Sequence, residues 1–108
     1  MAVRLLLAQQ LRLIEAELRQ LDWWTATSPT AVALASEQPF AVDSMAFEQW
    51  LQWLFLPRMQ QLLESGAPLP SACGIAPMAE MALAERAYQA RVLLQVLGGF
   101  DRLITGAA

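Results

Sequence analysis

One mostly apolar stretch, Trp50 to Leu56, limits the folds open to this chain. Its side chains are apolar almost all the way round a helical wheel, and neighbours must cover such a helix on most sides. Asp43 or Ser44 offers a start signal upstream, by capping free backbone N–H groups of the first turn. Gly66 offers a stop signal, because it suits the left-handed turn that ends many helices. The sequence therefore predicts a buried central helix of about five or six turns.

Pro57 lies inside this expected helix. Its ring removes one backbone hydrogen bond and crowds the carbonyl of Trp53, four residues earlier, so the helix should kink or step there. Two interpretations are open at this point. The kink forms a docking notch lined by Trp53, Pro57 and Arg58, or it lets the helix wrap around its neighbours.

The N-terminal stretch carries apolar residues at alternating spacings of four and three, the pattern of an amphipathic helix. This stripe predicts a helix over residues 3–22. After it, Ser28-Pro29 is a helix-start signal, and the apolar residues 31–35 predict a short helix of two turns. The stripe consists of Leu7, Leu11, Ile14, Leu18 and Leu21.

The C-terminal third predicts one further long helix. Pro77 is tolerated in a first helical turn and can open it. Small residues at Ala87 and Ala90 are expected to let this helix approach the Trp-rich one closely, whereas Gly98 and Gly99 should weaken it by about 1 kcal/mol each relative to alanine. The apolar spacing of four and three returns at Leu83, Ala87, Ala90, Leu94 and Leu97.

Together these patterns predict one all-α domain over residues 1–108. It is a compact bundle of three long helices plus one short helix, with the central Trp-rich helix kinked at Pro57. A chain of 108 residues suits a single domain. Its apolar content of 56% exceeds the usual value of about 45–50%, which is typical of a thick core or of a face hidden against a partner.

The charged residues argue against direct binding to nucleic acid. All seven basic residues are arginines scattered singly along the chain, and the formal net charge is −3, whereas nucleic-acid binding draws on clustered basic residues. No apolar run reaches the 18 or so residues of a membrane-spanning helix. Cys73 is the only cysteine, so no internal disulfide can form. We expect a cytoplasmic protein.

The side chains that most enzymes need are missing. The chain has no histidine, which removes imidazole bases and His-ligated metals, and one cysteine cannot form a zinc site of the usual types. Among the carboxylates, Glu80 and Glu85 project about 140° apart on a helix, while Glu37 and Asp43 flank a turn where capping explains Asp43 more simply. We therefore expect no catalysis, no cofactor and no metal.

Four tryptophans in 108 residues are the strongest oddity of the composition. Large aromatic residues at helical spacing are typical of a core, as we expect for Trp50, but tryptophan is also favoured at the centres of protein interfaces. A partner protein or a second copy of the chain would cover such a surface. The alternative is a small-molecule or acyl ligand in a pocket between helices near Pro57. The candidate interaction surface comprises Trp23, Trp24, Trp53, Pro57, Arg58 and Met59.

Several blocks of sequence resemble the bacterial YqcC-like family, over nearly the whole chain. The resemblance implies a compact all-α bundle. It also implies an association with a C-type tRNA pseudouridine synthase, found for members in some proteobacteria, and hence an accessory role in tRNA modification. No catalytic residues are established for that family, so the resemblance assigns none here. The blocks are Pro39-Phe40, Asp43 to Met45, Phe47 to Met59, Pro68 to Pro70 and Ile75 to Met78.

Overall fold

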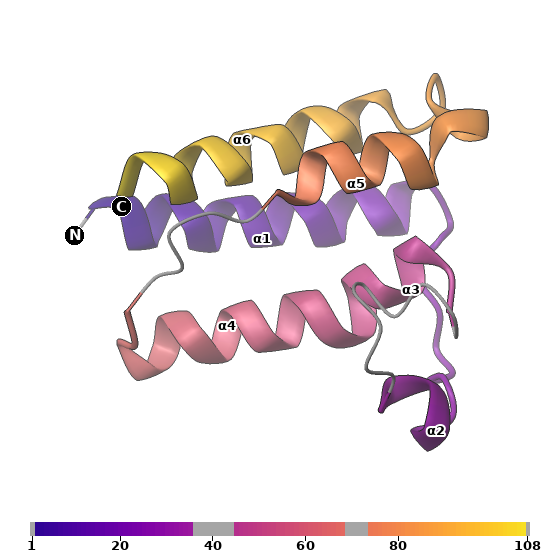
Figure 1. Cartoon of the computed structure of the whole chain (residues 1–108), viewed down its shortest axis with the longest axis horizontal. Helices are drawn as coiled ribbons and strands as arrows, with labels where there is room; N and C mark the ends of the chain where they lie inside the picture. Colours follow the sequence, from indigo (N-terminus) through magenta and orange to yellow (C-terminus); the bar gives the residue numbers. More distant parts are fainter. Residues whose placement is uncertain (1, 36–44, 69–73, 108) are drawn as a thin grey trace.

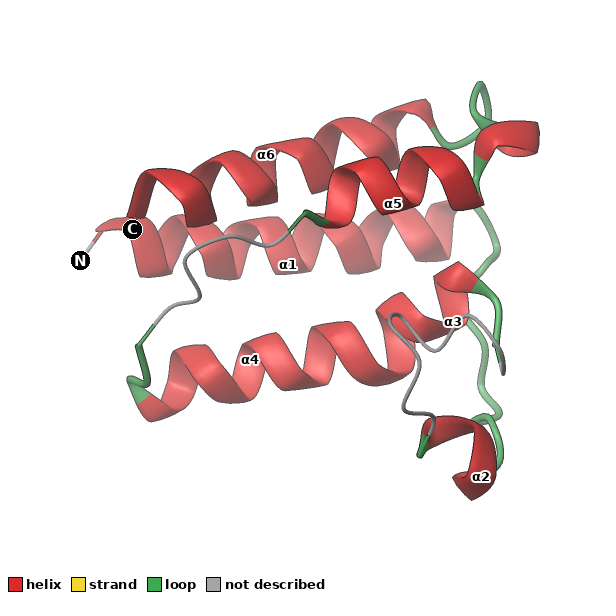
Figure 2. Ribbon diagram, in the orientation of Figure 1, coloured by secondary structure: helices red, strands yellow, loops and turns green. Residues whose placement is uncertain are grey.

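The computed structural model describes residues 2–35, 45–68 and 74–107, and all regular structure in these ranges is helical (Figures 1 and 2). The predicted all-α fold is therefore confirmed. The elements are α1 (Ala2–Gln20), α2 (Ala31–Leu34), α3 (Phe47–Trp50), the π-helical turn η2 (Leu51–Phe55), α4 (Leu56–Ser65), α5 (Ile75–Ala82), the 3-10 turn η3 (Ala84–Arg86) and α6 (Arg91–Ala107).

Helix α1 lies between two layers of the bundle. It packs against α6 on one side and α4 on the other, while α5 packs against α6. In Figure 1 the two chain ends lie at the same end of the molecule, because α1 and α6 run antiparallel. The Trp-rich helix therefore forms one layer and the α5–α6 pair the other, and α1 packs against both along a single buried stripe.

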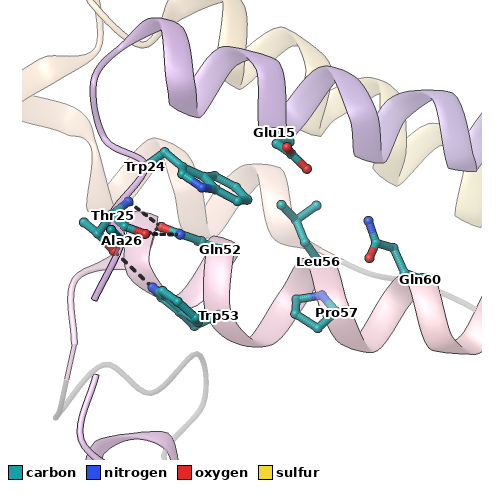
Figure 3. A pocket seen from close by; sticks show the side chains of 9 residues that line it. All are labelled: Glu15, Trp24, Thr25, Ala26, Gln52, Trp53, Leu56, Pro57 and Gln60. Carbon is teal, nitrogen blue, oxygen red and sulfur yellow. Dashed lines mark hydrogen bonds between the residues drawn. The ribbon is translucent and has the colours of Figure 1, made fainter. Parts of the chain in front are cut away.

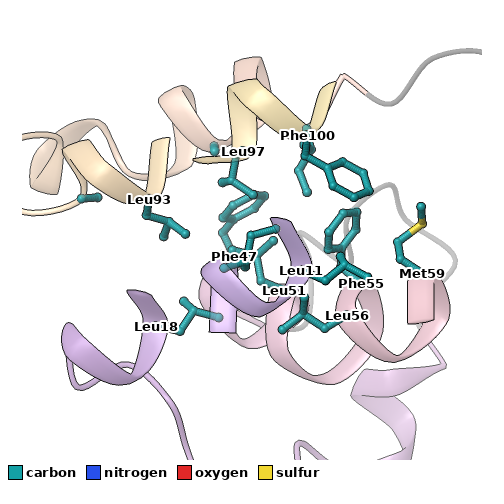
Figure 4. Close-up of a cluster of buried hydrophobic side chains, with 14 of the residues drawn as sticks. Leu11, Leu18, Phe47, Leu51, Phe55, Leu56, Met59, Leu93, Leu97 and Phe100 are labelled. Carbon is teal, nitrogen blue, oxygen red and sulfur yellow. The ribbon is translucent and has the colours of Figure 1, made fainter. Parts of the chain in front are cut away.

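The core is built from the apolar stripe that the N-terminal pattern predicts. Leu7, Leu11, Ile14 and Leu18 are all at most 2% exposed. They meet buried residues of η2 and α4 on one side and of α6 on the other (Figure 4). The rings of Phe55 and Phe100 join the two outer layers directly, edge to face, with centroids 5.3 Å apart. The facing residues of α6 are Leu93, Leu97, Phe100 and Ile104.

The Trp-rich helix runs continuously through α3, η2 and α4, over residues 47–65. Gly66 ends it with a φ of 72°, the left-handed conformation that the sequence predicts. The expected caps, Asp43 and Ser44, lie outside the described residues, and the N-cap is Ala46. The stretch Trp50 to Leu56 is covered on most sides as expected, because each of its residues is buried or half-buried. From Pro57 onward the helix is exposed along one side.

Pro57 is accommodated by a local widening of the helix. In the turn η2 just before it, the backbone N–H of Leu56 donates to the carbonyl of Leu51, five residues earlier, and Pro57 is then the second residue of α4. A π-type turn inserts an extra residue and so turns its side chains relative to a regular helix. The step predicted at the proline therefore exists, and Gln52 and Trp53 both contact the segment that follows α1.

The predicted C-terminal helix is two helices, which corrects the sequence interpretation. An unbroken helix over residues 75–107 would be about 50 Å long at the usual rise, whereas the longest dimension of the molecule is 34 Å. The chain instead reverses between α5 and α6, which allows Leu83 and Ala90 to be buried together. Ala87 is exposed, and α6 packs mainly against α1 and α5 rather than against the Trp-rich helix.

The reversal is fixed by a contact across the α5–α6 pair. Asp101 of α6 accepts hydrogen bonds from the backbone N–H groups of Ile75 (3.1 Å) and Ala76 (2.8 Å), the first two residues of α5. A carboxylate at a helix N-terminus satisfies free donors and opposes the helix dipole favourably. Helix α5 is thus capped by its antiparallel neighbour.

Candidate functional site

The segment after α1 is shaped by the way that helix ends. Asp22 adopts a φ of 63°. The N–H of Asp22 donates to the carbonyl of Arg19 (3.1 Å), and the N–H of Trp23 donates to that of Leu18 (2.9 Å). This pair of bonds is the Schellman motif that commonly ends helices. It turns the chain sharply and directs Trp23 and Trp24 to different places.

Gln52 holds this segment against the Trp-rich helix. Its side chain is 5% exposed, and its amide pairs with both backbone groups of Thr25. The N–H of Thr25 donates to Gln52 Oε1 (2.9 Å), and Gln52 Nε2 donates to the carbonyl of Thr25 (2.6 Å). A buried amide needs partners for both ends, and here one residue supplies both.

Thr25 also fixes the ring of Trp53. The indole Nε1–H of Trp53 donates to Thr25 Oγ1 (3.1 Å), and this hydroxyl in turn donates to Gln52 Oε1 (3.2 Å). The view in Figure 3 shows Gln52 between the rings of Trp24 and Trp53. The indole of Trp53 is therefore held by the segment after α1, while the ring of Trp24 lies against Arg19, whose guanidinium carbon is 4.5 Å from the ring centroid.

A hollow of about 410 Å³ opens beside these residues, between α1 and the Trp-rich helix. Its walls combine apolar surface with a few polar groups, as Figure 3 shows. The carboxylate of Glu15 lies at the α1 side, where it is paired with Arg19 at 3.0 Å. The residues that line it are Glu15, Trp24, Thr25, Ala26, Gln52, Trp53, Leu56, Pro57 and Gln60.

A second hollow of about 280 Å³ continues along the same two helices. Gln60 lines both, so the two hollows are neighbours along α4. We refer to the pair, with their lining residues, as the α1–α4 groove. The second hollow is lined by Ala8, Leu11, Arg12, Gln60, Leu63 and Glu64.

The structure brings together half of the predicted interaction surface. Trp24, Trp53 and Pro57 line the first hollow. Arg58 is exposed but lines neither hollow. Met59 is only 7% exposed and belongs to the core (Figure 4), so it is not a surface residue. Position 59 faces the core because it lies one turn after the buried Phe55.

Trp23 has a different environment from Trp24. The guanidinium carbon of Arg86 lies 4.3 Å from the centroid of its ring. The same guanidinium binds the carboxylate of Glu48 through two hydrogen bonds of 3.0 and 3.1 Å. Trp23 therefore takes part in a clamp between the segment after α1, helix α3 and η3, and lines neither hollow.

Sequence reasoning missed Gln52, Thr25, Glu15 and Gln60. Gln52 did leave a signal, because it is the one polar residue within Trp50 to Leu56 and a polar residue at a buried position needs dedicated partners. Thr25 left none, since its role depends on a chain segment 27 residues away.

The described residues offer no metal centre. Within residues 2–35, 45–68 and 74–107, no group of three or more histidine, cysteine, aspartate or glutamate side chains could hold a metal ion. Glu80 and Glu85 are both exposed. Glu37, Asp43 and Cys73 lie outside the described residues.

Comparison with known proteins places the chain. A family profile described as DUF446, tRNA pseudouridine synthase C, matches residues 6–103. The chain belongs to this family. The uncharacterized protein YqcC of Escherichia coli K12 is 40% identical over 92% of this chain and 91% of its own length. An uncharacterized protein of Haemophilus influenzae is 47% identical over 71% of this chain and 73% of its own length. The resemblance to YqcC-like proteins is thereby confirmed.

The chain is also similar to a solved structure and to part of a longer protein. The solution NMR structure of protein YqcC from E. coli matches with a TM-score of 0.89 and 38% identity, over 100% of this chain and 92% of that chain. A protein of Pectobacterium carotovorum named tRNA pseudouridine synthase C is 47% identical over 57 residues, which are 53% of this chain but 15% of that protein. That protein is therefore several times longer than this chain.

Within the described residues, no helix has both the length and the apolar character required to span a bilayer.

Proposed function

We propose that this chain is a protein-interaction module that assists a C-type tRNA pseudouridine synthase and has no catalytic group of its own. The observation that carries the proposal is the match to a segment forming 15% of a much longer protein of that name. The matched segment is 53% of this chain, and a segment that recurs within a longer protein is expected to work beside the remainder of that protein. The description of the family points to the same enzyme.

The geometry supports an interaction role. The hollow beside Trp24 and Trp53 presents two indoles at the surface of a small bundle, that of Trp53 held by a hydrogen bond to Thr25 and that of Trp24 packed against the Arg19 guanidinium. Rigid, partly exposed aromatic residues are favoured as the anchors of protein interfaces, because little conformational entropy is lost when they are covered. The first hollow is therefore the centre of the proposed docking surface.

The arginines support an indirect role in tRNA modification rather than direct binding of tRNA. Among the described residues, four of the seven have the partners given next, which leaves few for phosphate groups. Arg19 pairs with Glu15, Arg86 with Glu48, Arg4 with the carbonyl of Ala67, and Arg91 with that of Tyr88. With a net charge of −3, the chain is suited to a protein partner. The cytoplasmic location expected from the sequence remains part of this proposal.

Co-purification tests the proposal directly. The chain and the C-type tRNA pseudouridine synthase of the same organism are mixed at micromolar concentrations and analysed by size-exclusion chromatography and calorimetry. We expect a complex of defined stoichiometry. In a tRNA assay, the chain alone should form no pseudouridine, and its addition should change kcat/KM of the synthase. Absence of any complex at these concentrations would remove the proposed function.

A second function, binding of a small molecule in the first hollow, is favoured by one observation. A volume of about 410 Å³ is within the usual range of ligand pockets, about 300–1,000 Å³, and mixed apolar and polar walls are typical of them. Native mass spectrometry of the purified chain tests this alternative. A reproducible added mass that disappears on Trp53→Ala substitution would support it, and a spectrum of bare chain after enrichment with cell metabolites would count against it.

A further inference from the structure

The two hollows of the α1–α4 groove lie in line along one face of the Trp-rich helix. The residues of the Trp-rich helix that line the groove are spaced as on a single helical face, and α1 supplies the opposite wall. The groove is therefore a trough between two roughly parallel walls. The lining positions of the Trp-rich helix are Gln52, Trp53, Leu56, Pro57, Gln60, Leu63 and Glu64.

The spacing of the hollows matches the repeat of an α-helix. Along the Trp-rich helix, the linings of the two hollows are centred about seven residues apart, which corresponds to about 10 Å. Two side chains separated by two turns of a bound helix have the same separation. The described residues contain no strand, so a partner segment has no sheet edge to extend, and a helix lying in a groove is the applicable recognition mode.

The charges along the groove indicate what the bound helix carries. Glu15 lines the first hollow, where Arg19 already pairs with it, and Glu64 lines the second hollow together with Arg12. The chain as a whole is acidic. The ion pairs found within the described residues do not include Glu64. A basic side chain on the flank of a bound helix would meet this carboxylate, and complementary charge at a rim raises the association rate and fixes the register.

We propose that the α1–α4 groove receives an amphipathic helix of a partner protein, with apolar anchors two turns apart in the two hollows and a basic residue opposite Glu64. This inference rests on the proposed function, because the helix is taken to belong to the synthase. It adds the site, the secondary structure and the charge pattern of the segment that binds.

Two neighbouring glutamines allow a matched test. Gln60 and Gln61 are both exposed on α4, but Gln60 lies between the hollows and Gln61 lines neither. Gln60→Arg fills the middle of the groove with a bulky cation, whereas Gln61→Arg makes the same change of charge outside it. Calorimetry with the synthase should give a Kd raised at least about tenfold for Gln60→Arg and within about twofold of the unchanged chain for Gln61→Arg.

Glu64→Gln extends the test to the charge pattern. It should weaken binding and flatten the dependence of Kd on salt concentration, because one exposed ion pair with the bound helix is lost. Thermal melting of all three variants checks that the fold is intact. Equal Kd values for Gln60→Arg and Gln61→Arg would overturn the groove as the binding site and leave the accessory function standing. No binding by the unchanged chain would remove both.

Discussion

At the scale of single residues, the amide of Gln52 determines the shape of the candidate site. It joins a buried position of the Trp-rich helix to both backbone groups of Thr25, whose hydroxyl in turn holds the indole of Trp53. Neither an apolar side chain nor a carboxylate supplies the donor and the acceptor that Thr25 requires. The geometry of the first hollow therefore depends on one polar residue in an otherwise apolar stretch.

Replacement of this amide should be costly. Gln52→Leu keeps the volume but leaves the N–H and carbonyl of Thr25 without their partner, so we expect a loss of about 2 kcal/mol in the free energy of unfolding. Urea denaturation followed by circular dichroism measures it. Gln61→Leu, an exposed position on the same helix, should stay within about 0.5 kcal/mol of the unchanged chain. A loss of that small size for Gln52→Leu would show that the amide network adds no stability.

At the scale of elements, the sequence predicts those features of a helix that are determined by residues close together in the chain. The stripe of α1 predicts its buried side, Gly66 marks the end of α4 by its left-handed turn, and Pro57 marks an irregular step. The break between α5 and α6 could not be predicted in this way. The residues around Ala84 and Arg86 are good helix formers. Tertiary packing overrides their helix propensity, because only a chain that reverses here can bury both α5 and α6 in so small a molecule.

The candidate site shows the same division between local and distant information. Trp24, Trp53 and Pro57 could be singled out from composition and helix rules, and they do line one hollow. Their neighbours Glu15 and Gln60 are ordinary polar residues of helix surfaces. They line the hollow only because α1 packs beside α4. Trp23 differs from Trp24 because the turn at Asp22 directs the two rings apart.

The glycine pair in α6 gives a prediction at this scale. Gly98 lies within a continuous helix, and a Cβ placed there would meet nothing closer than the flexible end of the Arg102 side chain, at 3.5 Å. Gly98→Ala should therefore raise the free energy of unfolding by about 0.5–1 kcal/mol through helix propensity. Thermal and urea denaturation measure the change. A fall in stability would mean that α6 is more tightly packed at this position than the structure shows.

At the scale of the whole molecule, a charged clamp connects three separate segments. Arg86 of η3 binds Glu48 of α3 through two hydrogen bonds and lies over the ring of Trp23 after α1. The Glu48 side chain is 16% exposed and that of Arg86 37%. A two-bond arginine–carboxylate pair combined with an aromatic contact is worth more than an isolated surface ion pair. It fixes the turn between α5 and α6 to the opposite layer.

A double-mutant cycle measures this clamp. Arg86→Ala, Glu48→Ala and the double variant should give a coupling free energy of about 1 kcal/mol, and added salt should reduce it only in part. Arg91→Ala is a control, because its guanidinium contacts the exposed Tyr88 of the adjacent turn rather than another layer. Additive effects of Arg86→Ala and Glu48→Ala would show that the pair does not stabilise the fold.

The measurement that tests the central claim most directly is 19F NMR of the chain labelled with 5-fluorotryptophan. Its four tryptophans give four probes, assigned by single Trp→Phe substitutions, and the unlabelled synthase is then added. If the α1–α4 groove is the docking surface, the resonances of Trp24 and Trp53 change in chemical shift when the synthase is added. Those of Trp23 and Trp50 keep their chemical shifts and only broaden, as all resonances do in a larger complex. Shifts confined to Trp23 and Trp50 would place the partner on another face and contradict the account.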